Sequence, residues 1–301
     1  MDLPAPVPTP DESAALEPGA LEPGALLRVR RPARQVAPII VASPHSGRFY
    51  HAEFLAAARL DPHALRKSED VLVDELFGAA PALGLPLIAA GFPRAWCDVN
   101  REPWELDPSM FHENLPDFVN ARSPRVAAGL GTIARVVASG EPIYRRKLRF
   151  AEAEARIRDC WEPYHAALAA LIAETRARFG ACLLVDCHSM PSALPAGTAR
   201  GPDIVLGDAH GASCARPLSA LIETALRGEG FVVRRNDPYA GGYVTRHYGR
   251  PRERVHAVQV EIARPLYVDE ARMRPHDGFA PVKAAMTRLM ETLIAAISTR
   301  L

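Results

Sequence analysis

The segment ACLLVDCHSMPS (residues 181–192) decides the fold, because an apolar run ends there in closely spaced polar residues. The run predicts a buried β-strand that leads directly into Asp186 and His188. If the strand continues through both residues, their side chains lie on one face, since side chains alternate along a strand. A histidine beside a carboxylate is suited to metal ligation, because the carboxylate can ligate the ion or orient the imidazole.

A second segment repeats this pattern. VAPIIVASPH (residues 36–45) is a short apolar run rich in β-branched residues, and it ends at His45, followed by Ser46 and Gly47. The run predicts another buried strand whose C-terminal end carries His45. One histidine at a strand end is ordinarily structural, but two in similar polar turns favour a metal site. The zinc-protease pattern HExxH is absent from the sequence.

Strand and helix patterns alternate along the chain. Further strands are predicted at 85–92, 203–208, 230–237 and 257–267, and helical patterns cover 60–84, 140–180, 217–230 and 281–300. Pro163 is expected to break or kink the second helical pattern. The alternation predicts an α/β fold with a largely parallel or mixed sheet flanked by helices. Because ligands gather at the C-terminal ends of strands in such sheets, we expect His45 and His188 at one site.

Three carboxylates compete for the place of a third metal ligand: Asp70, its neighbour Glu69, and Asp186. Asp70 and Asp74 would share one face of the helix predicted over 60–84. The alternative is that Glu69 and Asp70 only stabilise the start of this helix, where the dipole favours carboxylates.

Glu261 stands near the end of the strand predicted at 257–267. Strand alternation puts Val258, Val260 and Ile262 on one face and Glu261 on the other. A carboxylate near the end of an apolar strand is unfavourable to bury without a partner or a chemical role. We therefore predict Glu261 as the general base. The alternative is a glutamate that faces solvent from an edge strand.

Several arginines are candidates for substrate binding. FPRAWCDVNRE (residues 92–102) contains Arg94, Asn100 and Arg101, and the glycine-containing segment PYAGGYVTRHYG (residues 238–249) contains Arg246. Arginine is well suited to bidentate binding of carboxylates, so arginines near a metal would suit a small anionic substrate. The competing interpretations are that these arginines pair with nearby carboxylates, and that 238–249 is a plain hairpin.

Composition excludes several classes of function. The 36 basic and 35 acidic residues leave a net charge of +1, and no long basic run suggests a nucleic-acid partner. No apolar stretch approaches the roughly 18 residues of a membrane-spanning helix. The N-terminus carries acids and prolines where a signal peptide has a basic region and an apolar core. We therefore expect a cytoplasmic protein with no nucleic-acid or membrane partner.

The chain contains five cysteines, an odd number with no CxxC pair: Cys97, Cys160, Cys182, Cys187 and Cys214. In a cytoplasmic protein this scatter indicates reduced thiols and not a disulfide framework. A cysteine nucleophile is an alternative to the metal site.

Residues 1–26 differ from the rest of the chain. They are rich in proline, alanine, glutamate and glycine, and LEPGA occurs twice in tandem, at 16–20 and 21–25. A five-residue repeat cannot form a packed unit, so this segment is predicted to be a low-complexity, disordered tail. Residues 27–301 are expected to form a single domain.

Eight segments, taken together, resemble the N-formylglutamate amidohydrolase family. They are SPHSG, RKSEDVLVDELF, FPRAWCDVNREPWELDP, IYRRKL, DCHSMPS, GDAHGASC, PYAGGYVTRHYGRP and VQVEIARPLY, and they occur in the family's order between about residues 38 and 270. The resemblance implies a fold like that of zinc carboxypeptidases, with a mixed sheet flanked by helices. It also implies hydrolysis of N-formyl-L-glutamate to formate and L-glutamate, a step of histidine degradation.

The resemblance also implies roles for particular residues. His45 and His188 match metal-binding histidines, and Asp70 matches an acidic position more often than Glu69 does. Glu261 would be the general base by analogy with carboxypeptidases. The HxxE ligand pair of those enzymes is absent, since Arg48 stands three residues after His45.

Further implied roles concern the substrate. Asn100 and Arg101 look like the Asn-Arg pair that binds a substrate carboxylate in carboxypeptidases. Arg94 or Arg246 would stabilise the oxyanion of the tetrahedral intermediate. One divalent ion, zinc, would have an open position for water.

Two other functions compete with this one. A related metallohydrolase could act on another N-acyl amino acid or a small peptide, because a pocket can change while the ligands stay. A non-enzymatic protein that binds small acids would have no need of a general base at Glu261. The expected partner in each case is a small anion, and the sequence does not determine the oligomeric state.

Overall fold

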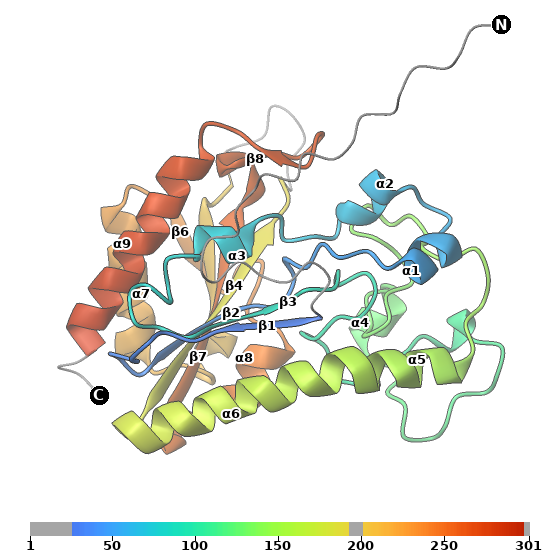
Figure 1. The fold of residues 1–301 in the computed structure, drawn as a ribbon, viewed down its shortest axis with the longest axis horizontal. Coiled ribbons are helices and arrows are strands. Elements are labelled where there is room, and N and C mark those ends of the chain that lie inside the picture. Colours follow the sequence, from blue (N-terminus) through green and yellow to red (C-terminus); the bar gives the residue numbers. More distant parts are fainter. Residues whose placement is uncertain (1–25, 193–200, 298–301) are drawn as a thin grey trace, which may run out of the picture.

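The computed structural model describes residues 26–192 and 201–297, and its centre is a twisted seven-stranded sheet (Figure 1). The strand order across the sheet is β1-β3-β2-β4-β7-β5-β6. The strands are β1 (Leu27–Arg30), β2 (Ile39–Ser43), β3 (Leu87–Ala90), β4 (Cys182–Met190), β5 (Ile204–Gly207), β6 (Val233–Arg235) and β7 (Val255–Ala263). The short strands β8 (Val268–Asp269) and β9 (Arg274–Pro275) form a separate pair.

The sheet is mixed and mostly parallel, as the alternation of strands and helices predicts. β3, β2, β4 and β7 lie side by side in parallel, and β6 runs parallel to β5. β1 is antiparallel to β3, and β5 is antiparallel to β7. The central strands β2, β4 and β7 therefore end at the same edge of the sheet. This edge is where the predicted site residues meet.

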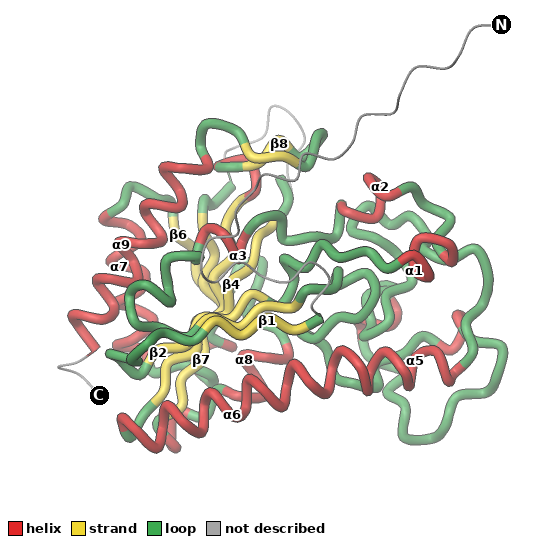
Figure 2. Tube along the Cα trace, viewed as in Figure 1, coloured by secondary structure: helices red, strands yellow, loops and turns green. Residues whose placement is uncertain are grey.

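Helices cover both faces of the sheet (Figures 1 and 2). The helices of the described residues are α1 (Ala52–Ala57), α2 (Pro62–Arg66), α3 (Val73–Leu76), α4 (Pro124–Ala127), α5 (Phe150–Arg156), α6 (Glu162–Phe179), α7 (Arg216–Gly228), α8 (Tyr243–Tyr248) and α9 (Phe279–Ile297). Long loops between β3 and α5 build the part of the molecule beside the sheet, which Figure 2 shows largely in green.

Strand alternation divides the hydrophobic core into two layers. Val41 and Val185 point to the face covered by α3, α7 and α9. Ile40 and Leu184 point to the opposite face, where α6 packs through residues such as Leu168. Because β4 is buried on both faces, its sequence is a nearly continuous apolar run.

The prediction of one helical segment over 60–84 is wrong in its extent. Only Pro62–Arg66 and Val73–Leu76 are helical, and a loop separates them. Leu72 ends this loop in the left-handed region, with φ of 58°, a conformation that interrupts a right-handed helix. Asp70 therefore lies in the loop, and Asp70 and Asp74 do not share a helix face.

Pro163 marks the expected irregularity in the long helical segment. α5 begins at Phe150, and a π-helical turn at Ile157–Trp161 separates it from α6. Pro163 lies in the first turn of α6, immediately after the π-helical segment. Proline has no backbone N–H, so it fits best where the hydrogen-bond register of the helix changes. The segment 238–249 also differs from a hairpin, because most of its second half forms α8.

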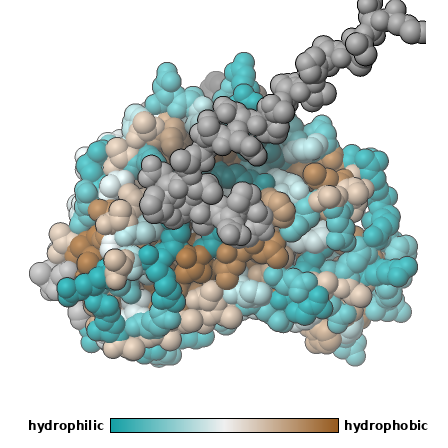
Figure 3. Space-filling model, viewed as in Figure 1, coloured by the Kyte–Doolittle hydropathy of each residue, from teal (hydrophilic) through white to brown (hydrophobic). Residues whose placement is uncertain are grey.

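The surface of the described chain is mainly hydrophilic along the flanks seen in Figure 3. None of the described helices has both the length and the apolar character that crossing a membrane requires. Apart from Leu26, the tail predicted at residues 1–26 lies outside the described residues.

Candidate active site

His45 lies two residues beyond the C-terminal end of β2, in a turn whose position is fixed by close packing of the backbone. The ring is 1% exposed. Gly47 follows in the same turn, and a Cβ atom there would lie 2.0 Å from the backbone oxygen of Phe92. Only glycine permits this close approach of the two backbones. The turn after β2 is thereby fixed against the turn after β3.

Asp70 lies beside His45 and His188, and it comes from the loop before α3. Its backbone N–H donates to the backbone oxygen of His45 at 3.0 Å, which ties the two loops together. Its Oδ2 lies 2.9 Å from Nδ1 of His188 and 3.4 Å from Nδ1 of His45. Burial alone would raise the pKa of Asp70, but the hydrogen bond with His188 and the charges of both histidines hold that pKa well below its usual range.

His188 comes from β4 itself, where the strand continues through Asp186 and His188 as predicted. Burial lowers the pKa of His188, but Asp186, Asp70 and Glu261 outweigh it and raise that pKa well above its usual range. Buried carboxylates thus surround the two imidazoles, and this environment favours a positive charge between them.

The ligand atoms of His45, Asp70 and His188 all lie within 4.8 Å of one another, and all three side chains are buried. The outer nitrogen, Nε2, of each histidine has a partner of its own, and these partners fix the orientation of the two rings. Nε2 of His45 is 2.8 Å from Oδ1 of Asp98. Nε2 of His188 is 3.1 Å from Oδ2 of Asp186 and 3.2 Å from Nδ2 of Asn100. Both Nδ1 atoms are therefore directed toward Asp70.

Glu261 is brought to the site by strand register. β4 and β7 pair in parallel with His188 opposite Glu261 and Asp186 opposite Gln259. Gly242 donates its backbone N–H to Oε1 of Gln259, so the amide nitrogen of Gln259 faces Glu261 and donates to its Oε1 at 2.6 Å. Burial is the main cause that raises the pKa of Glu261, and the charge of Asp70 adds to it.

A cavity of about 260 Å³ opens beside these groups. Three arginines contribute to its wall, together with Glu261 and Asp98. The lining residues are Ser68, Arg94, Ala95, Asp98, Arg101, Leu130, Ala134, Val136, Ala138, Ser189, Pro191, Tyr239, Glu261 and Arg264. A small cavity with several cations and a carboxylate is suited to a small anionic ligand.

Arg94 and Arg101 both lie in this wall, as the sequence suggests. Arg94 donates to Oδ2 of Asp98 at 2.7 Å, so it pairs with a carboxylate and also borders the cavity. Arg101 donates from Nε to the oxygen of Leu130 at 2.8 Å and from Nη1 to the oxygen of Asn100 at 2.9 Å. Burial lowers the pKa of Arg101 to about 10.

Asn100 and Arg246 have other surroundings. The Asn100 side chain accepts from the backbone N–H of Val244 at 2.8 Å and contacts the outer nitrogen of His188, and it does not line the cavity. Arg246 in α8 lines a separate depression beside Ser213. The structure therefore brings Arg94 and Arg101 to the cavity, but not Asn100 or Arg246.

The competing third ligands face elsewhere. Glu69 accepts hydrogen bonds from Tyr50 and Arg66. Asp186 lies behind His188, on the side of the ring opposite Asp70. Geometry favours Asp70 over both.

The cysteines do not form a nucleophilic site. All five are buried with free thiols. Burial raises the pKa of each, to about 11 for Cys160 and Cys214 and about 12 for Cys182. Burial also raises the pKa values of Cys97 and Cys187 well above the usual range. A nucleophilic cysteine needs a lowered pKa and access to substrate, and neither condition is met.

Sequence reasoning missed several contributors to the site. The sequence patterns assign no role to Asp98, which contacts Nε2 of His45, or to Gln259, which donates to Glu261. They assign no role to Arg264. It is 4% exposed, lines the cavity, and places Nη2 3.4 Å from Oδ1 of Asp70. Its position three residues after Glu261, at the end of the same apolar strand, is the signal that could have found it.

Comparison with known proteins gives consistent matches. A family model described as N-formylglutamate amidohydrolase matches residues 37–268. An N-formylglutamate deformylase of Pseudomonas aeruginosa is 32% identical over 265 residues, which are 86% of this chain and 93% of that protein. An N-formylglutamate deformylase of Pseudomonas putida is 26% identical, over 86% of this chain and 92% of that protein.

A solved structure supports the same relationship. The crystal structure of N-formylglutamate amidohydrolase from Ralstonia eutropha JMP134 superimposes with a TM-score of 0.86 and 36% sequence identity. The match covers 92% of this chain and 100% of that one. The family model spans far more than half of the chain, and it includes every residue of the candidate site. The chain therefore belongs to the N-formylglutamate amidohydrolase family.

Proposed function

We propose that this protein hydrolyses the formyl amide bond of N-formyl-L-glutamate, yielding formate and L-glutamate, and that the reaction depends on one divalent metal ion. The observation that carries this proposal is the convergence of His45, Asp70 and His188 beside a cavity that Glu261 and three arginines line. The names of the relatives support the choice of substrate.

The residues present fit a zinc ion. Two imidazole nitrogens and one carboxylate oxygen are a typical ligand set for catalytic zinc, with metal–ligand bonds of about 2.0–2.2 Å. Tetrahedral bonds of that length separate the ligand atoms by about 3.3 Å. The separations of 3.4 Å and 2.9 Å from Asp70 are close to this value. The buried Nδ1 of His45 has no hydrogen-bond partner among the described residues, as expected of an atom that a cation would engage.

A carboxylate behind each histidine further supports the metal. Asp98 and Asp186 contact the outer nitrogens of His45 and His188, respectively. Such contacts orient the rings and increase the basicity of the ligating nitrogens. When bound, the ion would polarise the formyl carbonyl and lower the pKa of the attacking water.

Glu261 is the proposed general base. Its carboxylate lines the cavity, and burial raises its pKa, which favours uptake of a proton. It takes one proton from the attacking water and delivers it to the departing nitrogen as the carbon–nitrogen bond breaks. One water molecule and one amide are consumed, and formate and a free amine are formed.

The arginines give the cavity its proposed selectivity for an acid. Arg101 is held by two backbone oxygens, so its guanidinium is already oriented before an anion binds. We propose that it binds a carboxylate of the glutamate moiety. Arg94, adjoining Asp98 and the metal ligands, is the proposed partner of the oxyanion that forms during attack. Arg264, which lines the cavity and donates to Ser189, Lys67 and Asp70, is the proposed partner of the second carboxylate of the substrate.

We place the protein in the cytoplasm and the reaction in histidine degradation. The cytoplasmic proposal rests on five free, buried cysteines, which suit a reducing compartment. The assignment to histidine degradation rests on the resemblance of the sequence motifs alone.

The experiment that tests this function measures formate released from N-formyl-L-glutamate by the purified protein. A panel of N-acetyl-L-glutamate, N-formyl-L-aspartate and N-formyl-L-leucine serves as the comparison. We expect kcat/KM to be highest for N-formyl-L-glutamate and lowest for the leucine derivative, which lacks the side-chain carboxylate. If kcat/KM were higher for another acyl amino acid, that compound would be assigned as the substrate in place of N-formyl-L-glutamate. If no compound were hydrolysed, the proposed hydrolase activity would be contradicted.

A further inference from the structure

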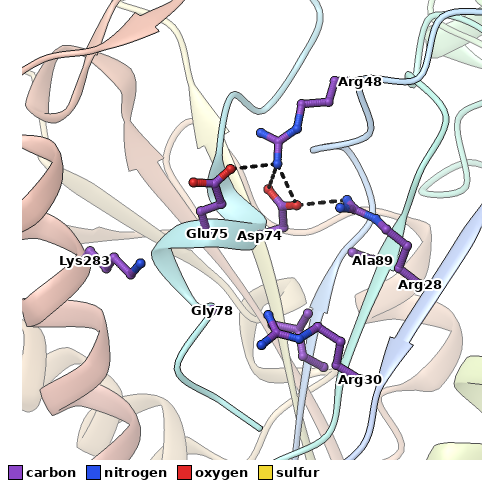
Figure 4. A pocket seen from close by; sticks show the side chains of 9 residues that line it. Arg28, Arg30, Arg48, Asp74, Glu75, Gly78, Ala89 and Lys283 are labelled. Carbon is purple, nitrogen blue, oxygen red and sulfur yellow. Dashed lines mark hydrogen bonds and ion pairs between the residues drawn. The ribbon is translucent and has the colours of Figure 1, made fainter. Parts of the chain in front are cut away.

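A second cavity, of about 300 Å³, lies on the opposite face of the sheet from the catalytic residues. Residues of β1, β3, α3 and α9 form its wall, and Arg48 reaches it from the loop after β2 (Figure 4). The lining residues are Arg28, Arg30, Arg48, Asp74, Glu75, Gly78, Leu87, Ala89 and Lys283. Leu87 and Ala89 belong to the core layer of α3 and α9, whereas His188 points to the other face.

The charges in this cavity do not balance. Asp74 accepts from Arg28 at 2.9 Å and from Arg48 at 3.2 Å, and Arg48 also donates to Glu75 at 2.8 Å. Figure 4 shows Arg30 and Lys283 directed toward the same space from β1 and α9. Neither makes an ion pair with any residue that the structure describes. Four cations therefore face two carboxylates, an excess of two positive charges.

Arg28 adds a separate observation. Its side chain is only 10% exposed, yet its Nε has no hydrogen-bond partner among the described residues. A buried donor without an acceptor is unfavourable. Arg30 and Lys283 are also partly buried, so water screens their mutual repulsion less than it would on an open surface. A negatively charged ligand in the cavity would remove this repulsion.

We propose that this cavity is a binding site for a small dianion, a dicarboxylate or a phosphate. Two negative charges neutralise the excess that Arg30 and Lys283 contribute. The guanidinium of Arg30 offers the paired N–H donors that match carboxylate and phosphate oxygens. The space of about 300 Å³ accommodates such an ion but not a macromolecule. The site is separate from the catalytic cavity, and the two have no lining residue in common.

Calorimetric titration of the intact protein tests this site, with inorganic phosphate and succinate as the two probes at constant ionic strength. The double variant Arg30→Gln/Lys283→Gln removes both uncompensated charges and keeps most of each side-chain stem. A control variant, Arg59→Gln/Arg252→Gln, loses the same charge from exposed positions outside the cavity. Thermal unfolding of both variants verifies that they are folded.

We expect one saturable binding event for at least one probe in the unchanged protein and in the control variant. In Arg30→Gln/Lys283→Gln its dissociation constant should rise at least tenfold, while any binding in the catalytic cavity persists. The probe that binds more tightly identifies the chemical class of the ligand. The site is refuted if neither probe binds saturably, or if the double variant binds both probes as the unchanged protein does.

Discussion

At the scale of single residues, the orientation of the two histidine rings depends on what their Nε2 atoms contact. Asp98 accepts from His45 and is itself held by Arg94. The pKa of Asp98 lies well below its usual range because the charges of Arg94, His45 and Arg101 outweigh the effect of burial. Asp98 is therefore a charged anchor that orients His45.

Asp98→Asn tests this anchor, because the substitution retains the shape of the side chain and removes its charge. We expect metal affinity to fall roughly 10- to 100-fold, as for other partners of metal-bound histidines. The measurement is competition for zinc with a chelator of known affinity.

The matched control is Asp107→Asn, which removes a carboxylate paired with Arg135 away from the site. Its metal affinity should equal that of the unchanged protein. Equal affinities for both variants would exclude Asp98 as the anchor of His45.

Glu261→Gln tests the general base. The amide retains the oxygen that accepts from Gln259 but cannot take a proton from water. We expect kcat to fall roughly 10²- to 10⁴-fold with metal content unchanged, the range typical of a lost general base. Steady-state kinetics and metal analysis of the same preparation measure both quantities.

Glu174→Gln, at an exposed carboxylate that pairs with Arg31, is the control and should retain full activity. If Glu261→Gln kept more than a tenth of kcat, another group would have to serve as the base.

At the scale of elements, the ends of three neighbouring strands assemble the site. β2 leads to His45, β4 carries His188, and β7 carries Glu261. The strand predictions and the rule that ligands lie at strand ends were enough to expect the two histidines together. The pairing of His188 with Glu261 was not predictable, because register depends on contacts between strands whose paired residues are 73 positions apart in sequence.

The loop that carries Asp70 shows why the local sequence pattern did not predict the structure of residues 60–84. Apolar residues at helical spacing favour one helix over 60–84. The structure interrupts it at Leu72, and Asp70 reaches the two histidines instead. A single buried charge cluster thus overrides the propensity of the segment. Asn100 and Arg246 do not line the cavity for a similar reason, since sequence proximity to a motif does not determine which way a side chain points.

Gly47→Ala tests how tightly the element ends are packed. The new Cβ would lie 2.0 Å from the backbone oxygen of Phe92, so the turns after β2 and β3 must separate. We expect a loss of stability on the order of 1–3 kcal/mol, as for other overpacked sites, together with weaker metal binding. Denaturant unfolding measures the first effect and chelator competition the second.

Gly228→Ala is the matched control for this prediction. Gly228 ends α7, and its added Cβ would meet nothing within 4 Å. Stability should stay the same or rise slightly. A Gly47→Ala protein as stable as Gly228→Ala would show that the turn after β2 is not held by close packing.

At the scale of the whole molecule, the sheet separates two kinds of site. The proposed catalytic residues lie at the C-terminal edge of β2, β4 and β7, on the face that α6 covers. The cationic cavity lies on the face of α3 and α9. The α/β class and the mixed sheet followed from the order of strand and helix patterns. The cationic cavity did not, because Arg30 and Lys283 are separated by 253 positions and only the packing of α9 against the sheet region brings them together.

Metal dependence is the central claim, and a titration of metal into the stripped protein tests it most directly. The ion is removed with a chelator, zinc is added back in fractions of one equivalent, and bound zinc and the rate of formate release are measured in each sample. We predict no turnover before addition, a linear rise of rate with bound zinc, and a plateau at one ion per chain. In His45→Ala and His188→Ala the rise should be absent. Full turnover by the stripped protein, with no zinc bound, would contradict the account.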